Sequence, residues 1–117
     1  MARGQNDETM KLDKELDRAR FDVIKERQRQ VVAEGRTREH DDLYVAGQLV
    51  SAAVTYALCA AFDHPDAIKK HFGRYWPWDR IHFKPKDKRR NLVRAAALLI
   101  AEIERLDRAE DYTKEDE

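Results

Sequence analysis

The run from Leu43 to Phe62 constrains the fold most, because it contains no charged residue in a chain of which 39% is charged. Alanine and aliphatic side chains would cover almost every side of a helix formed by this run, so such a helix has to be surrounded by other elements. We therefore predict that a helix from Asp41 or Asp42 to about Phe62 is the central one. Asp41 is its expected N-cap.

Two other long helices follow from hydrophobic periodicity. The first is expected from about Asp7 to Glu34, with Gly35 as its C-terminal stop. Its inner face repeats at spacings of three and four residues: Leu12, Leu16, Ala19, Val23, Arg27 and Val31. The other begins after Asp87, a candidate N-cap, and ends near Arg108. Its stripe is Leu92, Val93, Ala96, Leu99, Ile100, Ile103 and Leu106. The sequence predicts an all-α three-helix bundle.

The predicted organisation is one helical domain over residues 11–109, with a frayed N-terminus at 1–10 and an acidic disordered tail at 110–117. The connection from Asp63 to Lys86 is longer than a plain helix–helix loop. Pro65 favours a short helix through Phe72, followed by extended chain. Because three helices cannot cover a central apolar helix on all sides, we expect a homo-oligomer.

The single cysteine, Cys59, excludes an internal disulfide and is typical of a reducing compartment. The polar N-terminus does not resemble a signal peptide, and no apolar run reaches the roughly 20 residues of a membrane span. These features predict a cytoplasmic protein that does not enter the membrane.

Charge is unevenly distributed although the formal net charge is zero. Residues 67–94 carry ten Lys/Arg against two Asp/Glu, or +8, whereas residues 95–117 carry three against eight, or −5. Both tryptophans lie in the basic stretch. Cations interleaved with aromatic rings suit a ligand that has both phosphates and bases. The excess of positive charge is confined to this one stretch. A protein that binds duplex nucleic acid is usually basic over the whole domain, so this class is disfavoured.

We predict that Arg89 and Arg90 hold an anion at the N-terminus of the third helix, where free N–H groups and the helix dipole favour one. Lys84 is expected to assist, and Trp76 or Trp78 to stack on a base. These five residues form the core of the predicted site. Two further residues, expected to complete the pocket, are Arg27 and His40.

Other interpretations remain open for these residues. The tryptophans could close the open end of the bundle, and the cations could form a solvated face. His40 and Asp41 could serve only as caps. Acidic residues could instead surround Mg²⁺ in a pyrophosphohydrolase: Glu34, Glu39, Asp42, Glu102 and Glu104. These acids are scattered while the cations are concentrated, so we predict neither a metal nor a cofactor nor a catalytic residue.

Several blocks of the chain resemble a family of small bacteriophage and prophage proteins. They are ERQRQ at 26–30, EG at 34–35, EHDD at 39–42, WPW at 76–78, FKP at 83–85, RRNLVRA at 89–95 and AEIERLDR at 101–108. The family often has tryptophan at the position of Arg36. The resemblance covers residues 26–108 and implies a phage origin and a bacterial cytoplasmic setting, and it implies no reaction.

The function predicted from these features is that of a phage-encoded, non-catalytic binding protein. It would sequester an anionic, nucleotide-like ligand as a counter-defence sponge. Two alternatives are kept: an all-α, Mg²⁺-dependent nucleotide pyrophosphohydrolase, and a protein–protein inhibitor of a host defence enzyme. Convergence of several carboxylates would indicate the enzyme, whereas convergence of cations and rings would indicate the sponge.

Overall fold

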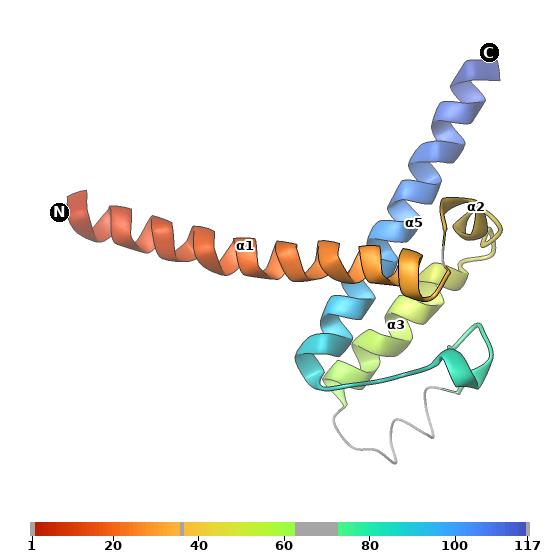
Figure 1. Cartoon of the computed structure of the whole chain (residues 1–117), viewed down its shortest axis with the longest axis horizontal. Coiled ribbons are helices and arrows are strands. Elements are labelled where there is room, and N and C mark those ends of the chain that lie inside the picture. The colour runs from red at the N-terminus through yellow and green to blue at the C-terminus, as the bar shows by residue number, and fades with distance from the viewer. Residues whose placement is uncertain (1, 36, 63–72, 117) are drawn as a thin grey trace.

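The structure is a computed structural model that describes residues 2–35, 37–62 and 73–116. Its elements are α1 (Ala2–Ala33), α2 (Arg38–Asp41), α3 (Gln48–Ala61), the 3₁₀ helix η1 (Arg80–His82) and α5 (Lys88–Asp116) (Figure 1). Helices and loops account for all of these residues, without a strand, which confirms the all-α prediction. The short helix predicted from Pro65 through Phe72 lies outside the described residues.

Two helix ends lie where local signals predicted them. α1 ends at Ala33, and Gly35 has a φ of 67°, the left-handed conformation that glycine adopts without strain. At the start of α5, the backbone N–H of Arg90 donates to Oδ1 of Asp87 at 3.0 Å. This hydrogen bond lowers the pKa of Asp87 below its ordinary value. Both the stop at Gly35 and the cap at Asp87 are confirmed.

The predicted start of the apolar helix is wrong. Asp41 is the last residue of α2, whose N-cap is Thr37, and α3 begins only at Gln48 after Gly47 with a φ of 80°. Asp41 does not cap α3 because its carboxylate is fully buried and accepts a hydrogen bond from Arg27.

The packing order also differs from the prediction, because α5 and not α3 is the shared helix. α3 packs along α5, and α1 crosses α5 on another side (Figure 1). Outward residues of α3 remain accessible, with Val50 38% and Val54 40% exposed. The apolar composition of the run correctly indicated burial but could not indicate which helix would have two neighbours.

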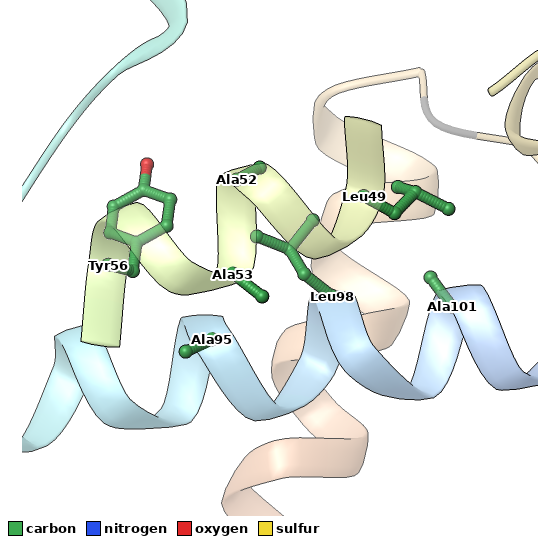
Figure 2. Packing of buried hydrophobic residues seen from close by; sticks show 7 residues of the cluster. All are labelled: Leu49, Ala52, Ala53, Tyr56, Ala95, Leu98 and Ala101. Atoms are coloured by element: carbon green, nitrogen blue, oxygen red, sulfur yellow. The ribbon is translucent and has the colours of Figure 1, made fainter. Parts of the chain in front are cut away.

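Small residues let α3 and α5 approach closely. In Figure 2, Ala53 of α3 points toward α5 near Ala95, Tyr56 lies at one end of the contact, and Ala52 is on the opposite side of α3. All four are buried. The rest of this cluster consists of Leu49, Leu98 and Ala101. Alanines provide little side-chain area, so close backbone approach replaces bulky interdigitation.

The connection from Gly73 to Asp87 closes one end of this core with aromatic rings. Trp76 lies edge-on to Tyr56 at 5.6 Å and to Trp78 at 5.3 Å between ring centroids. Phe83 lies against the same Trp76 ring at 5.0 Å. Offset and edge-on pairs of this kind stabilise beyond the area that they bury. The two tryptophans therefore do serve the core, which was one of the open interpretations.

Both long helices extend past the packed region (Figure 1). α5 continues through Asp116, where the sequence predicted a disordered tail from Glu110, and α1 is helical from Ala2. Extending an existing helix adds one hydrogen bond per residue without a new nucleation cost. The radius of gyration is 17.4 Å, against about 13 Å for a compact chain of this length. Among the described residues, no helix combines the length and apolarity needed to cross a membrane.

Candidate functional site

Cationic side chains from α1 and α5 converge on one pocket of about 530 Å³, which we call the arginine pocket. Its lining consists of Asp22, Lys25, Glu26, Arg29, Arg89, Arg90, Val93 and Arg94. Five of these residues are cationic and two are acidic, so the formal charge of the lining is +3. The crossing of α1 over the first turns of α5 creates this pocket, because neither helix alone carries all five cations.

On the side of the arginine pocket that α1 forms, Glu26 is the central acidic residue. It accepts hydrogen bonds from Nε of Arg29 at 2.6 Å and from Nη2 of the same guanidinium at 2.8 Å. Nε of Arg94 lies 3.9 Å from Glu26, and Arg29 also contacts Glu34 at 3.0 Å. The hydrogen bonds to Glu26, and secondarily to Glu34, raise the pKa of Arg29 above its ordinary value.

Arg89 and Arg90 form the α5 wall and remain accessible. Arg89 Nη1 pairs with Oδ2 of Asp22 at 2.8 Å, and Arg90 Nε pairs with Oδ2 of Asp87 at 3.2 Å. Their side chains are still 48% and 70% exposed. Exposed ion pairs are weak, so an incoming anion can compete for these guanidinium groups at little cost.

A second pocket, of about 270 Å³, is lined by rings and is called the aromatic pocket here. Its lining consists of Glu34, His40, Tyr44, Trp78, Asp79 and His82. The Tyr44 hydroxyl and Nε2 of His40 are hydrogen-bonded at 2.7 Å, and the Tyr44 ring lies 5.1 Å from that of Trp78. This pocket offers flat ring faces together with hydrogen-bonding groups at their edges.

The two pockets are adjacent along α1. Arg29 lines the arginine pocket and Glu34 lines the aromatic pocket, and their side chains are in direct contact at 3.0 Å. Arg94 of the arginine pocket lies over the Tyr56 ring at 5.7 Å, and Trp76, which contacts that ring, also contacts Trp78 of the aromatic pocket at 5.3 Å between ring centroids. The two pockets have no lining residue in common, so these side-chain contacts are what connects them.

Arg27 lies apart from both pockets, in a buried ion pair. Its Nη2 donates to Oδ2 of Asp41 at 2.9 Å, with the two side chains 10% and 0% exposed, and it also lies 3.4 Å from Oε2 of Glu104. Arg27 Nε and Nη1 are buried and have no hydrogen-bond partner among the described residues. Arg27 therefore joins α1, α2 and α5 from the inside.

Acidic residues at α2 and on α5 are paired with arginines and do not meet one another in a cluster. Arg108 Nη2 contacts Oδ1 of Asp42 at 2.8 Å and lies near Glu104, while Arg105 is hydrogen-bonded to Glu102. The bond to Glu102 raises the pKa of Arg105. Within the part of the chain that the structure describes, no group of three or more His, Cys, Asp or Glu residues could hold a metal ion.

The predicted site residues are divided among several places. Arg89 and Arg90 line the arginine pocket, His40 and Trp78 line the aromatic pocket, and Arg27 is buried beside Asp41. Trp76 packs in the core, with Nε1 donating to the carbonyl oxygen of Asp79 at 3.0 Å. Lys84 is exposed, and its backbone N–H donates to the Tyr56 hydroxyl. The residues are thus not gathered in one pocket.

Sequence reasoning missed the contribution of α1 to the arginine pocket. Lys25 and Arg29 lie on a helix with near-balanced charge, so composition did not single them out. Tyr44 and His82 were missed as well, although both line the aromatic pocket together with the predicted residues His40 and Trp78. A signal was present in the spacing: Lys25 and Arg29 are four residues apart, as are Asp22 and Glu26, so these residues share one face of a helix.

Comparison of the chain with protein-family models, curated proteins and solved structures found no match in any of the three.

Proposed function

We propose that this protein is a non-catalytic binding protein for a small anionic, nucleotide-like ligand. The observation that carries the proposal is the arginine pocket, in which five cationic side chains from two helices share one cavity with two acids. Phosphate oxygens are the ligands that several converging guanidinium groups recognise best, because each can form charge-assisted hydrogen bonds.

The adjacent aromatic pocket supplies the second half of the proposal. A nucleobase could stack on Trp78 or Tyr44, at about 1–3 kcal/mol per base, while His40 or His82 bonds its edge. Contact between Arg29 and Glu34 joins the two pockets, so one nucleotide or dinucleotide could occupy both. A free phosphate would use the arginine pocket alone.

A thermal-shift screen tests this function. Cyclic dinucleotides, cyclic trinucleotides, ADP-ribose derivatives and nucleoside triphosphates would be added with and without Mg²⁺, since a tight ligand raises the melting temperature by mass action. Inorganic phosphate serves as the control for simple anion binding. A nucleotide that stabilises the protein more than phosphate does supports the proposal, and the absence of any nucleotide binding in calorimetry would refute it in favour of a protein partner.

Matched variants locate the ligand. Arg90→Ala removes an exposed guanidinium from the arginine pocket and should weaken binding about ten- to a hundredfold. Arg80→Ala removes another exposed arginine, outside both pockets, and should leave the affinity unchanged. Equal losses from the two variants would show that binding follows general charge and not this pocket.

The enzyme interpretation is kept as the second candidate because arginines link these acids: Arg27 contacts both Asp41 and Glu104, and Arg108 contacts both Asp42 and Glu104. Arg27 and Arg108 now neutralise these carboxylates, so Mg²⁺ would have to displace an arginine. The ligand released by heat denaturation distinguishes the two functions: intact nucleotide indicates sequestration, whereas cleaved nucleotide that depends on Mg²⁺ indicates hydrolysis.

The biological setting belongs to the same proposal. A phage protein in the cytoplasm of its bacterial host could withdraw a nucleotide signal used in defence, and support for this comes from the resemblance of residues 26–108 to phage proteins. Self-association is also part of the proposal, and a host protein remains the alternative partner. Infection assays with and without the gene, in hosts that carry nucleotide-signalling defence, would test the setting.

A further inference from the structure

α5 has three faces, and only two of them are covered by the described residues. One face contributes Ala95, Leu98 and Ala101 to the core with α3. A second face contacts α1 through Arg89, Arg94 and Glu104. The third face is apolar: Leu92, Ala96, Leu99, Ile103 and Leu106.

This outer stripe has the pattern of a helix–helix seam. Its residues recur at spacings of four, three, four and three, which is the heptad spacing that keeps apolar side chains on one side of a helix. Leu92 is 49% exposed, Leu99 44%, Ile103 57% and Leu106 53%. Four large aliphatic side chains, each about half exposed in a continuous row, are not the scattered apolar residues of an ordinary surface.

Charge along α5 indicates which partner fits this stripe. The first turn carries Lys88, Arg89 and Arg90, while the later part carries Asp107, Glu110 and Asp111. A second copy of α5 running antiparallel would place its acidic part beside the basic start of the first, and the reverse. The apolar and charged positions are also symmetric about Leu99. Leu92 and Leu106 each lie seven residues from Leu99, and Lys88 and Glu110 each lie eleven residues from it.

We propose that the outer stripe of α5 is a self-association surface, on which two copies of this chain pack antiparallel about Leu99. The arrangement is isologous, so each copy presents the same patch and both sets of complementary charges are used. The radius of gyration, larger than that of a compact chain of this length, is in keeping with a subunit whose long helices pack on a partner. This inference does not depend on the proposed nucleotide ligand.

The oligomeric state of the full chain tests the surface. Light scattering at micromolar concentration should give twice the 13.8 kDa chain mass for the wild type. Leu99→Glu should give the mass of one chain with unchanged helicity by circular dichroism, because Leu99 is partly exposed within the subunit. Ile81→Glu, at an exposed apolar residue in η1, should remain dimeric. A monomeric wild type, or a dimeric Leu99→Glu variant, would overturn the proposal.

Cysteine cross-linking tests the antiparallel direction. Leu99→Cys should form a covalent dimer, because the two Leu99 positions meet at the centre. Leu92→Cys should not cross-link with itself, since the two sites would lie about 21 Å apart, but should cross-link when mixed with Leu106→Cys. Wild-type protein is the control, as its Cys59 is buried. Efficient self-cross-linking of Leu92→Cys would show a parallel pair and refute the proposed arrangement.

Discussion

Replacing Arg27 by methionine should destabilise the fold far more than removing a surface arginine. Methionine keeps most of the length and apolar bulk of the side chain but leaves the Asp41 carboxylate, which is fully buried, without its guanidinium partner. Breaking one half of a buried pair costs about 3–5 kcal/mol. We expect the lower end, about 3 kcal/mol, because Arg27 Nε and Nη1 have no partner among the described residues and their burial already penalises the native state.

Such a loss is large against a typical total stability of about 5–15 kcal/mol. Urea unfolding followed by circular dichroism would measure it. Arg20→Met is the matched control, since Arg20 and Asp17 form an exposed pair with side chains 62% and 67% accessible. That variant should cost less than about 1 kcal/mol.

A double variant separates the charge from the packing. Combining Arg27→Met with Asp41→Asn removes the buried negative charge that Arg27 no longer neutralises, so the double variant should cost less than Arg27→Met alone. Equal costs for Arg27→Met and Arg20→Met, or a double variant that costs the sum of both single changes, would refute the buried-pair reasoning.

The remaining predictions concern the core and one turn. Burial raises the pKa of Cys59 from 9.0 to about 11, so its thiol should resist Ellman's reagent at pH 8 in native protein and react in urea. Because the native state keeps this proton longer than the unfolded state, the stability that it contributes is present below pH 9 and lost as the pH rises from 9 to about 11. Gly47→Ala should cost about 1–2 kcal/mol because of the positive φ, whereas Gly73→Ala, with open space and no positive φ, should be nearly neutral in thermal melts. Ala53→Glu buries a charge against α5 and should leave the protein insoluble, whereas Val54→Glu, on the exposed side of α3, should stay folded; an Ala53→Glu variant that melts normally would contradict the observed core.

Local signals in the sequence determined where the long helices lie and how two of them end. Spacings of three and four residues identified α1 and α5, and the end of α1 at Gly35 and the cap at Asp87 depend on groups within a few residues of each helix end. Such caps and stops act on backbone groups within a few residues of the helix end, so the sequence predicts them without knowledge of the tertiary packing.

Only the tertiary structure decided which helix has two neighbours and where the charged groups meet. An apolar run reports how much surface must be buried, but the partner that buries it depends on the crossing of α1 over α5. Arg27 and Asp41 are 14 residues apart in the chain, so their pairing could not be read from local spacing, and it removed Asp41 from the expected cap. The arginine pocket has the same origin: Arg29 and Arg94 share it only because the two helices cross there.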